Sequence, residues 1–495
     1  MKKQAFNPFL PSFEYIPDGE PYVFGDRVYI YGSHDAFNGH HYCINNYVCW
    51  SAPVDDLGDW RYEGVIFDKE KDPLCKLPGE RRLYAPDVQL GADGKYYLYY
   101  AFDELGVISV AVCDEPAGEY EFYGHVHYPD GTLLGKKEGD IFQFDPGVYR
   151  EGDRVYLYSG FCPFFPWKPE GTENGNIQGP IVVELEADML TVKTEPKVIL
   201  PWVANSTGTE FEGNEFFEAS SMRKAGDKYY FIYSSVNGSA LCYAISDYPD
   251  RDFKYGGPIV SNGDIYLNGR TGAEALNYLG NIHGSIVQIR EDWFVFYHRH
   301  THKSQFSRQA CAERIRILED GSIPQVEITS CGLNNGPLVG KGTYEARIAC
   351  NLMSKYGVTG YGLERQQDKD IHPYFTQEGE DREENPNQYI ANMTDGAVAG
   401  FKYFDITDTT EISVSVRGES CCGIFKVYAV SLEELQGTIL NSWENEKYCV
   451  AKIALSESGD WKEYTSTFEN DMCVMALYFK YCGEGSCDFN SFTLK

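Results

Sequence analysis

Short segments in which aromatic and β-branched residues alternate with polar ones recur along the first two thirds of the chain. They are GDRVYIYGS from Gly25, DGKYYLYYA from Asp93, GDRVYLYSG from Gly152, GDKYYFIYSS from Gly226 and REDWFVFYHR from Arg290. Such alternation after a turn signal is typical of a hairpin strand. Equivalent aromatic residues are separated by 68, 59, 74 and 64 residues, and each step suits one four-stranded sheet. The pattern predicts an all-β fold with a five-bladed β-propeller.

A polar residue precedes each of these segments at nearly the same distance. The marker aromatics of the five segments are Tyr29, Tyr97, Tyr156, Tyr230 and Phe294. The polar residues lie 11, 10, 11, 12 and 11 positions earlier, and they are Asp18, Asp87, Asp145, Glu218 and His283. A single Asp before a turn is usually a turn residue, but turn chemistry requires no shared offset. Because the strand before the hairpin strand is the innermost of a propeller blade, we expect these side chains around the central axis.

A second all-β unit is expected after the propeller. The chain becomes turn-rich at CGLNNGPLVGKG, so we assign residues 1–325 to the propeller, 326–343 to a linker and 344–495 to the second unit. Within that unit the charged run FTQEGEDREENPNQ predicts a solvated loop.

Composition narrows the class of partner. The net charge of −31 comes from 74 acidic against 43 basic residues, which argues against nucleic acid or an anionic membrane as a partner. The fifteen cysteines form no C-x-x-C pair, so a zinc ribbon is not expected. The first twenty residues contain no apolar core of a signal peptide, and no apolar run is long enough to span a membrane. We therefore expect a cytoplasmic protein.

The axial acids suit the hydrolysis of a glycosidic bond with inversion. That reaction needs two carboxyl groups in opposite protonation states, about 6.5–9.5 Å apart, so that a water molecule fits between base and sugar. A third carboxylate near the acid would raise its pKa by like-charge repulsion. Asp87 is our candidate for this third role.

The five segments together resemble glycoside hydrolase family 43 over about residues 6–325. The resemblance rests on NPFLPSFEYIPDGEPYVFGDRVYIYGSHD, YAPDVQL, FFEASSMRKAGDKYYFIYSS and HGSIVQIREDWFVFYHRH. It implies that Asp18 is the general base, Glu218 the general acid and Asp87 the aspartate that tunes the acid. It also implies that His283 helps to hold an axial metal ion, usually calcium.

Two positions depart from the family pattern. The family base usually lies in an Asp-Pro dipeptide, whereas Asp18 precedes a glycine and Glu20 precedes Pro21. The shared offset favours Asp18. For the acid, Glu218 competes with nearby glutamates and is favoured by its register; the competitors are Glu210, Glu212 and Glu215.

Other residues are weaker candidates for substrate contact. Asp145 is assigned to substrate binding. Trp50 and Tyr84 are candidates to stack on a sugar or to fill the core. His34 and its neighbour Asp35 border the pocket or stabilise a turn, and Arg308 binds sugar hydroxyls or forms a surface salt bridge. His300 and His302 are interpreted as loop residues.

The second unit resembles carbohydrate-binding module family 6 over about residues 340–495, on YEARIACNL, YIANMTDGAVAGFKYFD and CDFNSFTLK. The resemblance implies a β-sandwich (jelly-roll). Glu345 and Asp488 match the stations of a calcium site, and Tyr389 and Trp461 those of sugar-stacking aromatics. The alternative is a module that only supports the propeller or lines its active site.

These observations predict an exo-glycosidase that removes terminal α-L-arabinofuranosyl residues from arabino-xylo-oligosaccharides, with calcium as cofactor. A xylan 1,4-β-xylosidase, or an enzyme with both activities, is the alternative. A non-catalytic sugar-binding propeller is a third possibility, but it would not require both Asp18 and Glu218.

Overall fold

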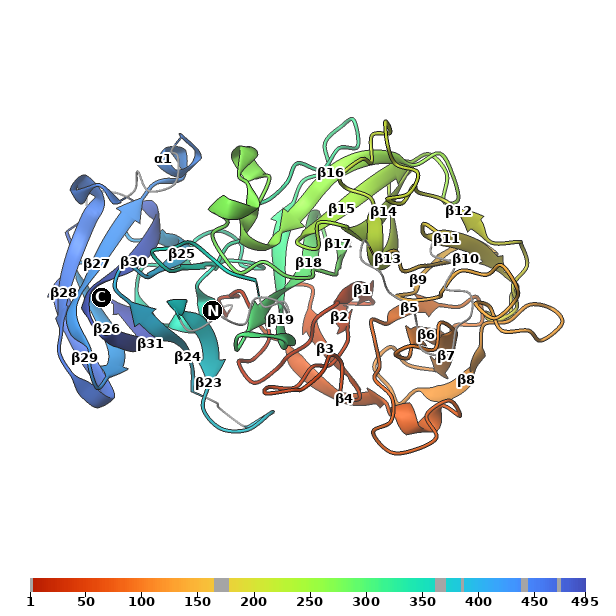
Figure 1. Cartoon of the computed structure of the whole chain (residues 1–495), viewed down its shortest axis with the longest axis horizontal. Coiled ribbons are helices and arrows are strands. Elements are labelled where there is room, and N and C mark those ends of the chain that lie inside the picture. The colour runs from red at the N-terminus through yellow and green to blue at the C-terminus, as the bar shows by residue number, and fades with distance from the viewer. Residues whose placement is uncertain (1–2, 164–177, 361–370, 384–386, 438–443, 470–472) are drawn as a thin grey trace.

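The computed structural model describes residues 3–495 except 164–177, 361–370, 384–386, 438–443 and 470–472. The chain is built almost wholly of antiparallel sheets, in an elongated molecule whose C-terminal sheets lie at one end (Figure 1). In the described residues the one α-helix is α1 (Leu432–Gly437). No helix in these ranges is long and apolar enough to cross a membrane.

Five consecutive sheets occupy the first two thirds of the chain, and each is an antiparallel meander. The first sheet contains β1 (Glu20–Phe24), β2 (Arg27–Tyr31), β3 (Tyr47–Pro53) and β4 (Arg61–Phe67). The second contains β5 (Asp87–Leu90), β6 (Tyr96–Ala101), β7 (Ile108–Cys113) and β8 (Glu121–His125). The third contains β9 (Gly147–Glu151), β10 (Arg154–Ser159), β11 (Ile181–Leu185) and β12 (Lys197–Val198).

The remaining two sheets follow the same order. The fourth contains β13 (Phe216–Ala225), β14 (Lys228–Ser235), β15 (Ala240–Ser246) and β16 (Lys254–Ser261). The fifth contains β17 (Ser285–Ile289), β18 (Asp292–Thr301) and β19 (Ser304–Ile315). Short 3-10 turns lie at η1 (Lys69–Lys71), η2 (Asn262–Asp264), η3 (Leu267–Gly269), η4 (Gly272–Glu274), η5 (Ala346–Ile348) and η8 (Glu446–Tyr448).

The first strands of the five sheets, β1, β5, β9, β13 and β17, surround a common axis, as in a β-propeller. Hydrogen bonds join each sheet to the next near its first strand and close the ring. They pair Tyr22 with Asp87, Asp87 with Val148, Asp145 with Ala219, Ser221 with Ser285 and Gly284 with Gly19. The predicted hairpin segments form β2, β6, β10, β14 and β18, since the aromatic residues that alternate along them pack between neighbouring sheets.

Aromatic side chains fill the spaces between the sheets. Tyr31 and Tyr47 from the first sheet pack with Tyr100 from the second. On the other side of the first sheet, Val28 packs with Phe294 of the fifth sheet. A wedge-shaped gap between radiating sheets suits large side chains, which explains the high aromatic content of the chain.

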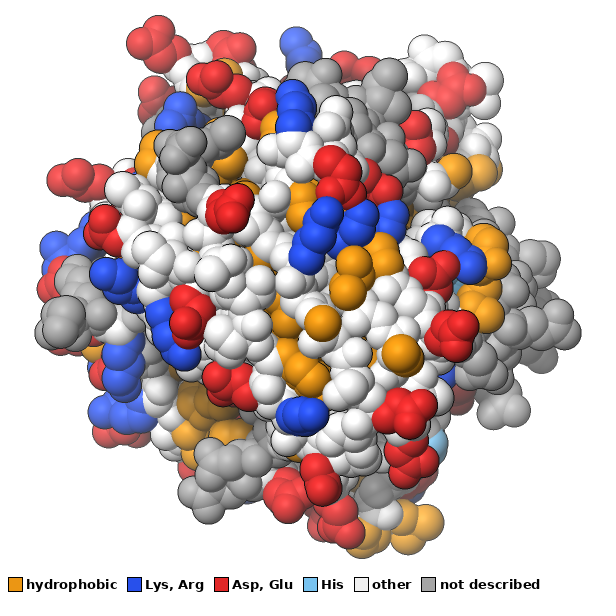
Figure 2. Space-filling model, turned by 90° about the vertical axis from the view of Figure 1, so that its left-hand side faces the viewer, with side chains coloured by type: hydrophobic (Ala, Val, Ile, Leu, Met, Phe, Trp, Pro, Cys, Tyr) orange, Lys and Arg blue, Asp and Glu red, His pale blue; other side chains and the backbone are white. Residues whose placement is uncertain are grey.

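Two six-stranded sheets form the C-terminal part. One contains β20 (Leu338–Val339), β22 (Asn351–Met353), β25 (Val398–Asp405), β27 (Cys422–Val430), β28 (Cys449–Leu455) and β30 (Val474–Glu484). The other contains β21 (Gly342–Glu345), β23 (Tyr374–Gln377), β24 (Gln388–Thr394), β26 (Glu411–Gly418), β29 (Ser458–Thr467) and β31 (Ser486–Leu494). Their facing side chains, such as Phe401, Phe479 and Phe492, form one buried core. Figure 2 shows acidic and basic side chains scattered over the outer face of this part.

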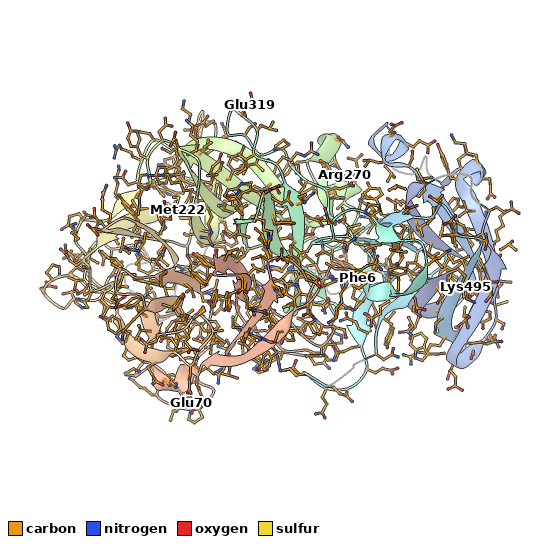
Figure 3. All side chains as sticks on the ribbon, turned by 180° about the vertical axis from the view of Figure 1, so that it is seen from behind. Phe6, Glu70, Met222, Arg270, Glu319 and Lys495 are labelled. Carbon is orange, nitrogen blue, oxygen red and sulfur yellow. The ribbon has the colours of Figure 1, made fainter. Side chains whose placement is uncertain are left out.

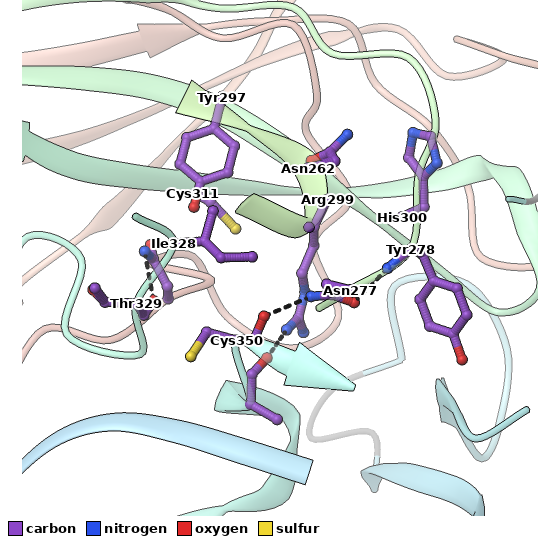
Figure 4. A pocket seen from close by; sticks show the side chains of 13 residues that line it. Asn262, Asn277, Tyr278, Tyr297, Arg299, His300, Cys311, Ile328, Thr329 and Cys350 are labelled. Atoms are coloured by element: carbon purple, nitrogen blue, oxygen red, sulfur yellow. Dashed lines mark hydrogen bonds between the residues drawn. The ribbon is translucent and has the colours of Figure 1, made fainter. Parts of the chain in front are cut away.

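The two parts of the molecule are packed closely together. Tyr278, from the segment before β17, belongs to the core of the C-terminal sheets. Phe6 lies at the junction (Figure 3) and its ring meets that of Tyr344 edge-on. A small cavity of about 20 Å³, room for one water molecule, remains beside Arg299, whose guanidinium donates to the carbonyl of Ala349 (Figure 4).

Candidate active site

The structure brings Asp18, Asp145, Glu218 and His283 together at one end of the axis, as their sequence offsets predict. Strand pairing shows why. Tyr22, Tyr149 and Val287 lie opposite the marker aromatics of their own sheets, and each lies four residues after an axial residue. Asp18, Asp145 and His283 therefore occupy equivalent positions in their sheets.

Asp87 belongs to a different layer of the axis. Gln89 is the residue opposite the marker Tyr97, so Asp87 lies only two residues before that pairing and is equivalent to Glu20. Its carboxylate accepts hydrogen bonds from Tyr22 Oη at 2.7 Å and from the Val148 amide at 2.7 Å. The tuning role predicted for Asp87 is therefore corrected: Asp87 lies two residues deeper along the axis than the position of Asp18, and the charges that shift the pKa of Glu218 are those of Asp18 and Arg308.

Asp18 is held as a buried carboxylate directly before β1. Arg308 Nη1 donates to Asp18 Oδ1 at 3.0 Å. The Asp18 amide donates to His298 Nδ1 at 3.3 Å, while His298 Nε2 donates to the Asn281 carbonyl at 3.0 Å. Burial favours the neutral acid, but the Arg308 charge and smaller contributions from neighbouring side chains together outweigh it, and the pKa of Asp18 lies below its usual value. Asp18 is therefore ionised at neutral pH.

Arg308 connects this carboxylate to a second one. It is only 2% exposed, and its Nε and Nη2 donate to the two oxygens of Asp35 at 2.8 and 3.0 Å. Its guanidinium also lies 4.9 Å from the Tyr42 ring centroid. The salt bridge expected at the surface is therefore buried, and contact with sugar hydroxyls stays a prediction. Its hydrogen bonds position Asp18.

Glu218 lies in an irregular part of β13. The pairing of β13 with β14 shifts register on both sides of Glu218, and the next residue, Ala219, has a positive φ of 70°. Such bulges redirect side chains and are common beside active sites. Burial, followed by the negative charge of Asp18, raises the pKa of Glu218 to about 8. Glu218 is therefore protonated at neutral pH.

Asp145 is the carboxylate that accompanies the acid. Its Oδ2 accepts from the amide of Ala219, the residue after Glu218, at 3.2 Å. Burial, and then the negative charges of Glu218 and Asp18, raise the pKa of Asp145 well above its usual value. Two carboxyl groups that share a site in this way do not ionise independently.

Glu20, the alternative candidate for the base, lies outside the layer of Asp18. It lies in the deeper layer with Asp87, where Arg223 Nη2 and Ser221 Oγ donate to its Oε2. Burial raises the pKa of Glu20 to about 8, with Arg223 acting in the opposite direction. The competing glutamates near the acid are also engaged elsewhere: Glu210 accepts from the Tyr255 amide, Glu212 from the Gly208 amide and Glu215 from Ser206 Oγ.

His283 lies between the two layers. Its Nδ1 is 3.7 Å from Asp145 Oδ2, and its Nε2 is 3.9 Å from Glu20 Oε1. Within the described part of the chain, both Glu20 Oε1 and His283 Nε2 are buried without a hydrogen-bond partner. In the same residues no group of three or more His, Cys, Asp or Glu side chains is placed to hold a metal ion directly.

The remaining propeller candidates are placed around this centre. Trp50 is a core residue whose Nε1 donates to Glu14 at 2.8 Å. His34 also contacts Glu14, at 3.0 Å. Tyr84 is partly buried, with its ring 5.0 Å from that of Phe144. The loop assignment of His300 is wrong, because it lies buried in β18; His302 follows that strand.

Sequence reasoning missed His298 and Tyr42. His298 could have been found from the sequence, because it is a histidine at an inward-facing position of a predicted aromatic strand. Tyr42 donates to Gln305 and lies near both Arg308 and Glu218, which contribute to the shift of its pKa. Its place in a long loop gave no periodic signal.

The C-terminal candidates form a different arrangement from the one expected. Tyr389 and Trp461 lie together, with ring centroids 5.3 Å apart, but Arg417 covers both rings at 4.8 and 4.4 Å. Arg417 Nε donates to Asp488 at 3.0 Å, and Glu345 pairs with Arg347. Arginines therefore engage both carboxylates that were expected to bind calcium.

The charged run is solvated in part, as predicted: Glu378, Glu380 and Glu383 are exposed, while 384–386 lie outside the described residues. Asp381 and Arg382 are half-buried and bind residues of the first sheet's loops: Asp381 accepts from the Phe37 amide at 2.7 Å, and Arg382 pairs with Glu14.

Comparison with known proteins gives consistent matches. The model of glycosyl hydrolases family 43 matches residues 6–323. A xylosidase/arabinosidase of Thermoclostridium stercorarium is 54% identical over 500 residues, covering 100% of this chain and 99% of that protein. A xylosidase/arabinosidase of Bacteroides ovatus is 29% identical over 324 residues, covering 59% of this chain and 87% of that protein.

A solved structure shows the same fold. It is a β-xylosidase/α-arabinofuranosidase from a compost microbial metagenome, in complex with xylotriose and in a calcium-free form. Its TM-score is 0.50 at 24% identity, with coverage of 66% of this chain and 99% of that chain.

Proposed function

The chain belongs to glycosyl hydrolase family 43, and on that premise we propose that it removes terminal α-L-arabinofuranosyl residues from arabinoxylan-derived oligosaccharides with inversion. The observation that carries the proposal is the pair of opposite pKa shifts in one site, lowered for Asp18 and raised for Glu218. A glycosidase that works by general acid and base needs this difference at one pH. A sugar-binding propeller without catalysis does not.

The residues have distinct roles in the proposed reaction. The Asp18 carboxylate takes a proton from a water molecule as the water oxygen bonds to the anomeric carbon. The bond from that carbon to the glycosidic oxygen breaks, and Glu218 gives its proton to the departing oxygen. Asp18 ends protonated and Glu218 ionised. Asp18 and Glu218 come from the first and fourth sheets, which are not neighbours in the ring, and this separation supports inversion.

Asp145 takes the tuning role in this proposal. Its carboxyl lies against the backbone next to Glu218, whose negative charge raises the pKa of Asp145; by the same repulsion, an ionised Asp145 would disfavour ionisation of Glu218. Arg308 keeps Asp18 charged and oriented. His298 is neutral, because burial lowers its pKa well below the usual value, and it fixes the backbone of Asp18.

A β-xyloside is the second candidate substrate. The relative at 54% identity is named a xylosidase/arabinosidase, which supports both activities in one pocket. We propose arabino-xylo-oligosaccharides as the substrate class. The fifteen cysteines are free thiols, which supports our proposal of a cytoplasmic location.

We also propose that the five sheets are the blades of a five-bladed propeller and that residues 344–495 form a jelly-roll related to carbohydrate-binding module family 6. The ring of hydrogen bonds around the axis and the shared core of the two C-terminal sheets support this. We propose to include β20 and β21 in this unit, since they pair with strands of the C-terminal sheets.

Calcium is proposed at the axis beside His283. The unpartnered Glu20 Oε1 and His283 Nε2 are 3.9 Å apart, and a carboxylate oxygen with bridging waters suits this ion. Bound there, calcium would supply positive charge to the buried acids. In the C-terminal sheets the carboxylates of Glu345 and Asp488 do not fit a calcium ion, because arginines occupy them.

The experiment is hydrolysis of p-nitrophenyl α-L-arabinofuranoside and p-nitrophenyl β-D-xyloside, with NMR of the first sugar released. We expect cleavage of the arabinofuranoside, with the product appearing first as the β-anomer. Release of the α-anomer would overturn inversion, and cleavage of neither glycoside would overturn the proposed substrate class. Preferential cleavage of the xyloside would favour the second candidate.

A further inference from the structure

Residues 378–383, the described part of the turn that follows β23 and which we call the β23–β24 turn, reach the loops that surround the proposed base. Asp381 Oδ1 accepts from the Phe37 amide at 2.7 Å, and Asp381 Oδ2 accepts from Asn45 Nδ2 at 3.3 Å. Both partners belong to the loop of residues 34–46, which we call the clamp loop. The turn is therefore tied to the clamp loop at two points.

The clamp loop is connected directly to the site. Within it, Asp35 Oδ1 accepts from the Cys43 amide at 2.9 Å, and Asn45 Nδ2 donates to the Asp35 carbonyl at 3.0 Å. The Asp35 carboxylate receives Nε and Nη2 of Arg308, whose Nη1 holds Asp18 at 3.0 Å. Each step from Asp381 to Asp18 is thus a hydrogen bond or a covalent connection.

Arg382 provides a second attachment next to the first. It pairs with Glu14, which is fully buried, and its Nη1 lies 2.9 Å from His34 Nε2. Burial would raise the pKa of Glu14, but His34 and Arg382 together bring it below its usual value. Without Arg382, the buried carboxylate of Glu14 beside the clamp loop would lose one of the two side chains that stabilise its negative charge.

The base of the turn is buried against the same region. Tyr15 Oη donates to Gln377 Oε1 at 2.5 Å, and Gln388 Nε2 lies 3.3 Å from Tyr15 Oη. Gln309, the neighbour of Arg308, donates to Gln388 Oε1 at 3.3 Å. These contacts fix the turn relative to the strand that carries Arg308.

We propose that the β23–β24 turn is a positioning element of the active site, in which Asp381 and Arg382 hold the clamp loop so that Asp35 and Arg308 orient Asp18. The C-terminal sheets then complete the catalytic centre. This inference deepens the proposed function and rests on Asp18 as the base. A misplacement of about 1 Å at a reacting group can cost a rate factor on the order of 10², so a turn far from the substrate can control the rate.

The test compares Asp381→Ala with Glu380→Ala in the full chain. Glu380 is an exposed carboxylate in the same turn and serves as the matched control. Hydrogen–deuterium exchange reports on the clamp loop without any substrate. We expect faster exchange in peptides covering residues 34–46 for Asp381→Ala, and wild-type exchange for Glu380→Ala.

Kinetics on the p-nitrophenyl glycosides provide the second readout. For Asp381→Ala we expect kcat/KM to fall about 10- to 100-fold and the acid limb of its pH profile to move to higher pH, because Arg308 stabilises ionised Asp18 less well. Asp381→Asn, which keeps an oxygen for the Phe37 amide, should recover most of the rate. If Asp381→Ala matches Glu380→Ala in exchange and in pH profile, the proposal is overturned, even when its Tm falls.

A variant that folds poorly does not end the test. Arg382→Gln keeps a polar, unbranched side chain but is shorter and has no charge, and we expect faster exchange around Glu14 and His34 with the same shift of the acid limb. Wild-type exchange and an unmoved limb in this variant would count against the proposal. A wild-type enzyme that cleaves neither glycoside refutes the proposed function alone, since the exchange experiment is independent of the substrate.

Discussion

Replacing Arg308 by methionine tests the assignment of the base most directly. The substitution keeps an unbranched side chain and removes the guanidinium that donates at 3.0 Å to Asp18 and at 2.8 and 3.0 Å to Asp35. Both carboxylates are buried. Arg314→Met is the matched control, because Arg314 lies on the same strand and pairs with Asp292 at the surface.

The magnitude follows from the contacts that are lost. A hydrogen bond to a charged group contributes about 1.5–3 kcal/mol, and 1.36 kcal/mol corresponds to one pKa unit. Loss of the bond from Arg308 should therefore raise the pKa of Asp18 by about one to two units. Because the base must be ionised, the acid limb of kcat/KM moves to higher pH by the same amount. Leaving two buried carboxylates unpaired should also lower the free energy of unfolding by about 3–5 kcal/mol.

The sign of the stability effect is also fixed. The pKa of folded Asp18 lies below the unfolded value of 3.8, so the Arg308–Asp18 contact stabilises the protein above that pH and is lost as the pH falls through the folded value. The destabilisation by Arg308→Met should thus be full at pH 7 and shrink in acid. The assays are the pH dependence of p-nitrophenyl glycoside hydrolysis and urea unfolding at several pH values. An acid limb at the wild-type position, with stability equal to that of Arg314→Met, would refute the assignment.

Three further predictions concern the other axial residues. Asp18→Ala and Glu218→Ala should each fold normally, with circular dichroism like that of the wild type. Each should lose about 10³-fold or more in kcat, since general acid–base catalysis alone contributes about 10²–10⁴-fold. A variant with near wild-type turnover would disprove the role assigned to the replaced residue. The basic limb of the pH–rate profile is expected near pH 8 from the pKa of Glu218. Asp145→Asn should move this limb to lower pH, whereas Asp87→Asn should leave it in place. The reverse pattern would restore Asp87 as the tuning residue. Removal of calcium by a chelator should reduce activity, and added calcium should restore it. In His283→Ala, neither the chelator nor added calcium should change the activity. Equal activity before and after chelation would contradict an axial ion.

The positions of most axial residues could be predicted from the sequence, because the first two strands of each repeated sheet pair in a similar register. The aromatic marker in each hairpin strand pairs with a fixed residue of the preceding strand, and the axial side chain lies four residues before that one. Offsets of 11 therefore located Asp18, Asp145 and His283 correctly. Glu218, with an offset of 12, reaches the same layer through a bulge.

The sequence alone did not separate the two layers of the axis. Asp87, with an offset of 10, was grouped with the others, although its hairpin is one residue longer and Asp87 lies two residues closer to the paired position than Asp18 does. Only the pairing of Gln89 with Tyr97 shows that Asp87 occupies the position equivalent to Glu20. The same limit explains why the sequence favoured Asp87 over Asp145 for the tuning role that we now propose for Asp145.

Tertiary structure alone decided the contacts between segments far apart in the chain. Arg308 meets Asp18 across 290 residues, and Asp381 meets Phe37 across 344. No local pattern encodes such pairs, because periodicity reports which face of a strand is buried and not which neighbour lies against it. The alternation of aromatic and polar residues thus determined the sheets and the ring of acids. The packing of loops and of the C-terminal sheets against that ring determined which acid stays charged, since a pKa depends on the charges and the burial that only the folded chain brings together.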